Sequence, residues 1–138
     1  MEHKHLDIEI ATPAQKESIG QAVSCSAPGA FGYFQVLANH APLISELGVG
    51  ELTVEQSDAS HHYAISGGFL EVANNRVLIL LESAEKAEDI DVDRAERAKE
   101  RASQRLSASE DNVDFIRAKA ALTRAINRLK VAGRSATA

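Results

Sequence analysis

Residues 69–100 read FLEVANNRVLILLESAEKAEDIDVDRAERAKE, and within this stretch the chain changes character. Its first part places Asn74-Asn75 between two short apolar runs, which predicts a β-hairpin because asparagine tolerates the positive φ of a two-residue turn. Its last part is rich in alanine, glutamate, lysine and arginine, which are strong helix formers. The stretch therefore predicts a β-rich region followed by a helical region, with the break near residue 83.

The same break divides the composition of the whole chain. Every proline and every glycine except Gly133 precedes it, whereas 12 of the 15 lysines and arginines follow it. Residues 1–83 carry 3 basic and 10 acidic side chains (net −7), and residues 84–138 carry 12 and 10 (net +2). At 138 residues and 44% hydrophobic, the chain is long enough for one compact core. We expect a β domain over residues 1–84 and a helical appendage over residues 85–138.

The first half of the chain has the pattern of short strands. Residues 6–10, LDIEI, alternate apolar and acidic side chains, which predicts a strand with one buried face. Similar runs predict strands around residues 22–26, 33–37, 51–56, 62–66 and 69–73. Gly67-Gly68 lacks the lysine and the following helix of a phosphate-binding loop, so we expect a bulge or tight turn there. Repeated short strands indicate an antiparallel sandwich or barrel.

Composition and charge exclude several classes of protein. The sequence is acidic overall, with a pI of about 5.5, and therefore repels phosphate backbones and anionic membranes. Cys25 is the single cysteine, so no internal disulfide forms, and we expect it to be a small buried strand residue. The N-terminal residues are acidic, so we expect no secretion signal there, and the longest strongly apolar run, residues 77–81, is too short to cross a bilayer.

No residue pattern in the first half points to catalysis. The paired histidines His3 and His5, and His61 and His62, have no cysteine or acidic cluster at metal-ligand spacing, so we expect no metal site. A nucleophile beside a base and an orienting carboxylate is not recognisable in local order. We therefore expect a protein that is not an enzyme.

The second half predicts a helical hairpin. Helices are expected over residues 92–106 and 113–132, separated by a turn rich in serine, aspartate and asparagine, and Asp91 is a candidate cap of the first helix. A short connection makes the two helices antiparallel neighbours. The predicted seam is mostly alanine and comprises Ala95, Ala98, Ala102 and Leu106 on the first helix and Phe115, Ala118, Leu122, Ala125 and Leu129 on the second. Such a seam buries little apolar area, which predicts a marginally stable hairpin.

Arginines recur at helical spacing along both predicted helices. They are Arg94, Arg97, Arg101 and Arg105 on the first and Arg117, Arg124 and Arg128 on the second. Like charges four residues apart on a helix repel by about 0.2–0.5 kcal/mol. Three interpretations remain open: a solvated face relieved by nearby carboxylates, a nucleotide triphosphate held between the helices, or an acidic protein surface met by the extended helices.

Two segments of the first half carry a family resemblance. Residues 31–43, FGYFQVLANHAPL, and residues 66–72, SGGFLEV, resemble signature stretches of the epsilon subunit of F-type ATP synthases. The resemblance implies a flattened β-sandwich of about ten strands followed by a helical hairpin, located on the rotating central stalk. It also implies sandwich contacts with the gamma subunit and the c-ring, for which the candidates are Gly32, Tyr33, His40 and Pro42. The chain departs from the family pattern at Tyr33, Gln35 and Ala38, which replace an acidic residue, a glycine and a proline.

A second motif lies just beyond the break. Residues 90–95, IDVDRA, resemble the Ile/Leu-Asp-x-x-Arg-Ala motif of epsilon subunits that bind ATP in the folded hairpin. A helix capped by Asp91 and followed by ordinary helix formers gives the same letters. If the motif binds nucleotide, the resemblance implies these site residues: Glu85, Ile90, Asp91, Arg94, Ala95, Arg101, Arg124 and Arg128.

The sequence as a whole favours a non-catalytic rotor subunit that couples proton-driven c-ring rotation to ATP synthesis. In the family, the hairpin extends toward the alpha/beta catalytic hexamer and inhibits hydrolysis, while bound ATP holds it folded. No cofactor is required, ATP is a candidate regulatory ligand, and membrane contact is only indirect. The resemblance implies a peripheral position on the cytoplasmic side of a bacterial plasma membrane. A stand-alone nucleotide-binding sensor is the alternative. A nucleic-acid-binding hairpin is disfavoured by the net charge and by an aromatic content of only 4%.

Overall fold

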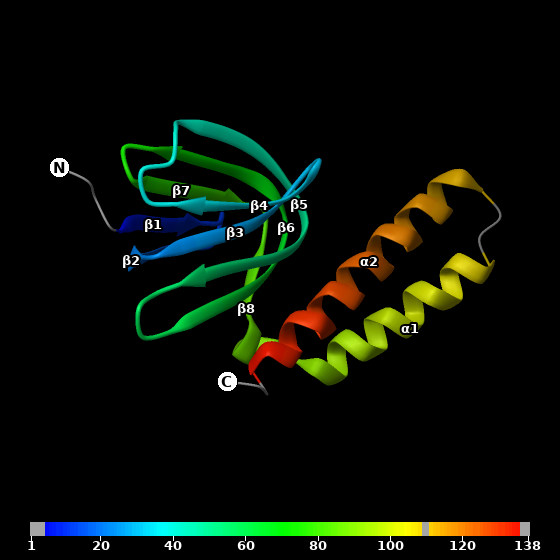
Figure 1. The fold of residues 1–138 in the computed structure, drawn as a ribbon. Helices are drawn as coiled ribbons and strands as arrows, with labels where there is room; N and C mark the ends of the chain where they lie inside the picture. The colour runs from blue at the N-terminus through cyan, green and yellow to red at the C-terminus, as the bar shows by residue number, and fades with distance from the viewer. Residues whose placement is uncertain (1–4, 109–110, 136–138) are drawn as a thin grey trace. The chain divides into compact units, whose positions relative to one another are not determined.

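The computed structural model describes residues 5–108 and 111–135, and it divides the chain into two compact units (Figure 1). The first unit ends at Glu85 and the second begins at Lys86. The strands are β1 (Leu6–Ala11), β2 (Lys16–Ala22), β3 (Ser24–Gly29), β4 (Gly32–Leu37), β5 (Leu43–Glu55), β6 (Ser60–Ala73), β7 (Arg76–Leu81) and β8 (Ala84–Lys86). The helical elements are the 3₁₀ turn η1 (Ala87–Asp89) and the α-helices α1 (Val92–Ala108) and α2 (Asn112–Ser135).

The strands form one hydrogen-bonded path in the order β2-β1-β7-β6-β5-β3-β4, and β8 pairs with β6. The pairs β1–β2, β3–β4, β3–β5, β5–β6 and β6–β7 are antiparallel. The pair β1–β7 is parallel, which corrects the expectation of a fully antiparallel sandwich. Parallel neighbours need a long connection rather than a hairpin, and here the chain between β1 and β7 builds most of the sheet.

Two long strands explain how eight strands take the place of the roughly ten expected. β5 has 13 residues and β6 has 14, and they pair with each other along nearly their whole length. The C-terminal end of β6 pairs with β7, whereas the C-terminal half of β5 pairs with β3. Different parts of each long strand therefore pair with different neighbours, so that each counts as one strand where two short ones were expected.

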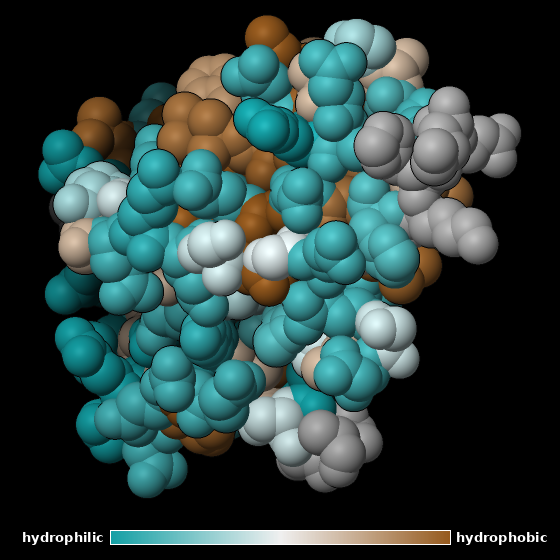
Figure 2. Space-filling model, turned by 90° about the vertical axis from the view of Figure 1, so that its left-hand side faces the viewer, coloured by the Kyte–Doolittle hydropathy of each residue, from teal (hydrophilic) through white to brown (hydrophobic). Residues whose placement is uncertain are grey.

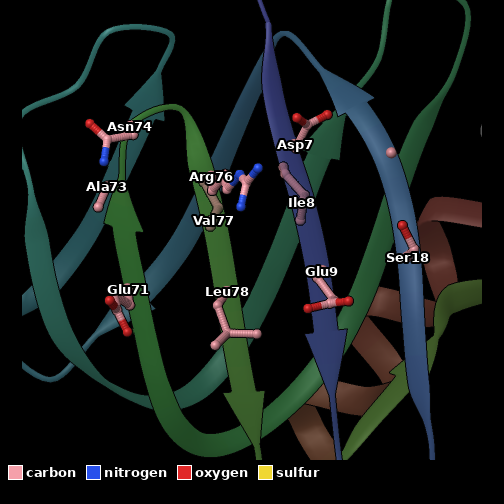
Figure 3. A pocket seen from close by; sticks show the side chains of 11 residues that line it. Asp7, Ile8, Glu9, Ser18, Glu71, Ala73, Asn74, Arg76, Val77 and Leu78 are labelled. Carbon is pink, nitrogen blue, oxygen red and sulfur yellow. The ribbon is translucent and has the colours of Figure 1, made fainter.

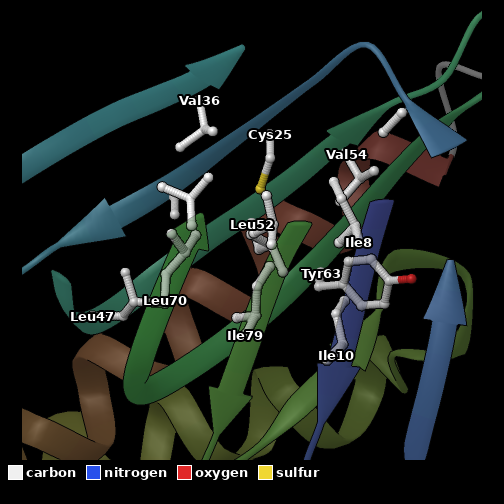
Figure 4. Packing of buried hydrophobic residues seen from close by; sticks show 14 of the residues in the cluster. Ile8, Ile10, Cys25, Val36, Leu47, Leu52, Val54, Tyr63, Leu70 and Ile79 are labelled. Carbon is white, nitrogen blue, oxygen red and sulfur yellow. The ribbon is translucent and has the colours of Figure 1, made fainter. Parts of the chain in front are cut away.

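The interior of the sheet holds one apolar core, to which seven strands contribute. Its members alternate along the strands as a period of two requires, so that residues 6, 8 and 10 of β1 point inward while Asp7 points outward. Cys25 is fully buried within this core, as expected. Figure 4 shows how side chains from different strands pack together in this core. They include Ile8, Cys25, Val36, Leu52, Tyr63, Leu70 and Ile79.

The predicted Asn74-Asn75 hairpin is confirmed. Both residues have positive φ, 51° and 61°, and the flanking residues Ala73 and Arg76 pair with each other.

Gly67-Gly68, where a bulge or tight turn was expected, lies inside the continuous strand β6. The pairing of β6 with β5 skips Gly67 but keeps its register. A Cβ at Gly68 would lie 2.0 Å from the carbonyl oxygen of Leu80, so only glycine allows this approach of β6 to β7.

The second unit is a pair of packed helices preceded by η1, which contacts α2. α1 and α2 lie side by side in Figure 1 and run in opposite directions. Residues at the seam that are buried are alanines, namely Ala95, Ala102, Ala118 and Ala125. Phe115, which the helical pattern placed on the seam, is 45% exposed because it lies in the first turn of α2, before the buried part of the seam begins at Ala118.

Candidate functional site

The start of α1 is organised by Asp91. The backbone N–H of Arg94 donates to Asp91 Oδ1 at 3.1 Å, and the N–H of Ala95 donates to the Asp91 carbonyl oxygen at 3.0 Å. This is the geometry of an N-cap, in which a side-chain oxygen satisfies an otherwise unpaired amide of the first turn. The cap interpretation of Asp91 is therefore confirmed, and its carboxylate also places negative charge at the positive end of the helix dipole.

The hexapeptide of residues 90–95 has buried side chains at its two ends and exposed side chains between them. Ile90 is only 7% exposed and Ala95 is fully buried, so neither side chain offers a surface to a ligand in this conformation. Asp91, Val92 and Arg94 are exposed. A nucleobase that contacted Ile90 would require this residue to leave its buried position. The exposed part of the motif therefore carries the Asp91 and Asp93 carboxylates, the Arg94 guanidinium and the apolar side chain of Val92.

The arginines predicted to meet phosphates lie on both helices. Arg94 and Arg101 are exposed on α1, Arg124 is exposed on α2, and Arg128 is half-buried on α2. Within residues 5–108 and 111–135, the guanidinium groups of Arg94, Arg101 and Arg124 make no ion pair. Seven residues separate Arg94 from Arg101, a rise of roughly 10 Å along the helix. These positive charges are solvated rather than neutralised, which is the state that attracts an anion.

Glu85, the remaining candidate for the nucleotide site, lies in β8 and is half-buried. It belongs to the first unit, whereas the other seven candidates belong to the second. The capped hexapeptide and the arginines therefore all belong to the unit of the helical hairpin, whereas Glu85 does not.

The four residues proposed for c-ring or gamma contact fall into two groups on the sandwich. Gly32 and Tyr33 begin β4, and His40 and Pro42 lie in the loop that follows its end. Gly32 and Leu37, the two ends of β4, are five residue-to-residue steps apart, a distance of roughly 17 Å in an extended strand. The predicted contacts therefore do not form one cluster but mark two ends of an exposed edge strand.

Tyr33 is 62% exposed, yet its hydroxyl is used within the fold. The N–H of Glu51 donates to the Tyr33 hydroxyl at 2.9 Å. A Cβ at Gly50 would lie 2.6 Å from the same oxygen, so the ring crosses β5 at a position where only glycine gives it room. The Tyr33 ring therefore lies across β5, and its hydroxyl oxygen accepts a hydrogen bond there.

An outward apolar surface of the sandwich was not anticipated. Phe69 pairs with both Glu46 and Leu80 across the sheet, and Phe69, Leu80 and Ile44 are all largely exposed. A cavity of about 450 Å³ opens beside Phe69 and Leu80. The available signal was the uninterrupted apolar run of residues 77–81, because a strand that is apolar at both parities has two faces to cover.

A larger depression, of about 860 Å³, lies on β1, β2, β6 and β7 (Figure 3). Asp7, Glu9 and Glu71 line it together with Arg76, whose side chain points toward β1.

Figure 2 shows one face of the molecule, which is mostly hydrophilic with hydrophobic side chains concentrated in its upper part. Exposed apolar patches with a polar rim are typical of surfaces that bind other proteins.

Groups with chemical reactivity are scarce in the described ranges. No set of three or more histidine, cysteine or acidic side chains there is arranged to hold a metal ion. Burial raises the pKa of the Cys25 thiol to about 12, which makes it unreactive near neutral pH. Neither described helix is long and apolar enough to span a membrane.

The fold and the surface together define a two-part protein, a β-sandwich followed by a helical hairpin, with exposed apolar side chains on the first part and exposed arginines on the second. Residues 5–87 match the family described as ATP synthase, Delta/Epsilon chain, beta-sandwich domain. Residues 88–133 match its companion, the long alpha-helix domain. The chain therefore belongs to the delta/epsilon chain family of ATP synthases.

Individual relatives agree with this assignment. The chain is 48% identical over 130 residues to the ATP synthase epsilon chain of Nitratidesulfovibrio vulgaris, covering 94% of this chain and 97% of the relative. It is 44% identical over 125 residues to that of Desulforamulus reducens, with 91% and 95% covered. Among solved structures, a chain of the Euglena gracilis mitochondrial ATP synthase, in an OSCP/F1/c-ring assembly, has a TM-score of 0.81 at 25% identity, with 100% and 84% covered.

The fold recurs at lower identity as well. A chain of the Tetrahymena thermophila mitochondrial ATP synthase, from a structure of the central stalk and c-ring, aligns with a TM-score of 0.60 at 13% identity and 97% coverage of both chains. This second likeness concerns the fold alone.

Proposed function

We propose that this chain is the epsilon subunit of an F-type ATP synthase and works on its central stalk, where it couples c-ring rotation driven by a proton gradient to ATP synthesis. The observation that carries the proposal is that both units match the two domains of the family, in order, over residues 5–133. Its role is structural and regulatory, without an active site of its own. The stand-alone sensor is less favoured because it leaves the sandwich unexplained.

The sandwich is proposed to bind the gamma subunit and the c-ring. Two features support this: the apolar surface formed by Ile44, Phe69 and Leu80, and the exposed strand β4 with the loop that follows it. The subunit is thereby peripheral and reaches the membrane only through the complex, on the cytoplasmic side of a bacterial plasma membrane.

The test of this function is replacement in an assembled ATP synthase depleted of its epsilon subunit. Adding this chain is expected to restore proton-driven ATP synthesis, and the purified chain is expected to co-elute with the gamma subunit in size-exclusion chromatography. A chain that neither binds gamma nor restores synthesis would refute the proposal.

The hairpin is proposed to act as an ATP-sensitive inhibitor of hydrolysis. Support comes from the solvated guanidinium groups of Arg94, Arg101 and Arg124, which suit either the phosphates of ATP or an acidic surface of the alpha/beta hexamer. A ligand shifts such an equilibrium only by its difference in affinity for the two states, so ATP must bind the folded hairpin more tightly. The burial of Ile90 requires that residue to move if it contacts the base.

Two measurements separate the parts of this regulatory proposal. Isothermal titration of the chain with Mg-free ATP up to millimolar concentration is expected to give binding that Arg94→Gln and Arg124→Gln weaken, and Lys99→Gln is the matched control on the same helix. Absence of binding would remove ATP as the regulator. Equal hydrolysis by complexes with and without residues 84–138 would remove the inhibitor role.

A further inference from the structure

Two turns of the sandwich that are far apart in sequence are joined by a reciprocal pair of asparagines. The N–H of Asn39 donates to Asn75 Oδ1 at 2.6 Å, and Asn75 Nδ2 donates to Asn39 Oδ1 at 3.3 Å. Asn39 lies in the loop between β4 and β5, and Asn75 lies in the two-residue turn between β6 and β7. Thirty-six residues of chain separate the partners, so the pair is a tertiary link and not a local turn contact.

The two ends of this link differ in how firmly they are held. The carbonyl oxygen of Asn75 accepts from the N–H of Asp7 at 2.8 Å, and the Ala73–Arg76 pair closes the turn, which anchors Asn75 to both β1 and the β6–β7 hairpin. In the loop, His40 is held by contacts close in sequence: its N–H donates to Leu37 O at 3.2 Å, and its ring Nδ1 lies 2.6 Å from Ala41 O. The turn that contains Asn75 is therefore the fixed end of the link, and the loop that contains Asn39 is held in place through it.

We propose that Asn75 is a positioning residue for the loop of residues 38–42, which holds His40 and Pro42 in the arrangement that meets the c-ring. This inference rests on the proposed function, and it assigns to the β6–β7 turn a part in coupling although Asn75 itself is outside the contact loop. The amide of asparagine suits the task because it accepts and donates at once, which a carboxylate or an aliphatic side chain does not.

The backbone conformation provides a clean test. Asn75 and Asn74 both have positive φ, and glycine adopts that conformation without strain. Asn75→Gly therefore removes the amide pair and keeps the turn. Asn74→Gly changes the adjacent residue of the same turn, whose side chain makes no hydrogen bond to any residue that the structure describes, and thus controls for the added freedom of the unfolded chain.

Two readouts are expected to separate Asn75→Gly from Asn74→Gly. Amide exchange of residues 38–41 becomes about 3- to 10-fold faster in Asn75→Gly, since a net hydrogen bond is worth about that factor in an opening equilibrium. Proton-driven ATP synthesis by the assembled complex falls in Asn75→Gly and stays at the wild-type rate in Asn74→Gly, when both are measured at a temperature at which each variant is fully folded. Asn39→Gly has an intermediate effect on exchange, because its own N–H still reaches Asn75 Oδ1.

Three results would overturn the inference. Equal loop exchange in Asn75→Gly and Asn74→Gly would show that the amide pair does not hold the loop. Faster exchange with unchanged ATP synthesis would show that the loop is held but that its position does not matter for coupling. Failure of the wild-type chain to restore synthesis at all would remove the proposed function and this inference with it, whereas the first two results leave the proposed function standing.

Discussion

The sandwich and the helical hairpin are built from different amounts of buried apolar surface. In the sandwich, the fully buried side chains include Leu6, Ile8, Leu52 and Ile79, whereas the hairpin seam is mostly alanine. An alanine in place of a leucine withdraws roughly 2 kcal/mol less of apolar burial at each position. The difference teaches that the two units of one chain can differ widely in how much apolar burial stabilises them, and it predicts that the helices of the hairpin separate at a lower cost than the strands of the sandwich.

The largest effect is expected in the sandwich core. Ile79→Ala should lower the free energy of unfolding by about 2–5 kcal/mol, because it removes a fully buried side chain and leaves a cavity. Ile44→Ala, at a position 72% exposed, is the matched control and should change it by less than about 0.5 kcal/mol. Urea denaturation of the full chain measures both. Equal effects would mean that the assigned core does not stabilise the sandwich.

Alkaline pH is expected to weaken the sandwich through Cys25. The folded pKa of this thiol is raised to about 12 from 9.0, so above pH 9 the unfolded chain loses a proton that the folded chain keeps. The stabilisation is therefore complete below pH 9 and decreases as the pH rises toward 12, by up to about 1.4 kcal/mol per pH unit. Cys25→Ala should have a shallower dependence of unfolding free energy on pH over this range, and parallel curves for the two proteins would contradict the assignment.

The stability of the helical hairpin is tested at Asp91, the N-cap of α1. Asp91→Ala should destabilise the first turn by about 0.5–2 kcal/mol, since the N–H of Arg94 loses its partner. Asp91→Asn retains a capping oxygen and should keep most of the stability, so it separates the cap from the charge. Amide exchange at Arg94 and Ala95 in the full chain reports the result. If Asp91→Asn is as unstable as Asp91→Ala, charge rather than the hydrogen bond holds the helix start.

Much of this architecture could be predicted from local patterns. The break near residue 83, the Asn74-Asn75 turn and the Asp91 cap depend on the preferences of a few neighbouring residues, and the structure has all three. Strand β2 was missed because KESIGQA is mostly polar, which suits an edge strand but gives no alternation. β6 was expected as two strands because Gly67-Gly68 has the letters of a turn, while only the neighbouring β7 reveals that these glycines permit close approach.

The candidate sites show the limit of local patterns more sharply. The arrangement of the arginines could be predicted, because residues three or four positions apart in sequence lie on the same face of a helix. The burial of Ile90 could not be predicted, since it depends on packing between segments distant in sequence. For the same reason the Asn39–Asn75 pair and the Tyr33–Glu51 contact have no signal in either segment alone.

The smallest effect expected is a gain in stability in the hairpin, which distinguishes a self-repelling arginine face from an ordinary solvated one. Arg101 has Arg97 four residues before it and Arg105 four residues after it, so Arg101→Gln should stabilise α1 by about 0.2–0.5 kcal/mol for each pair relieved. Lys99→Gln is the opposite control, because Lys99 follows Glu96 by three residues and its loss removes an attraction. Both effects should vanish near 1 M salt, where the screening length is about 3 Å. If Arg101→Gln instead destabilises α1 as Lys99→Gln does, the arginines belong to the packing of the hairpin, and the argument that they are held ready for an anionic partner fails.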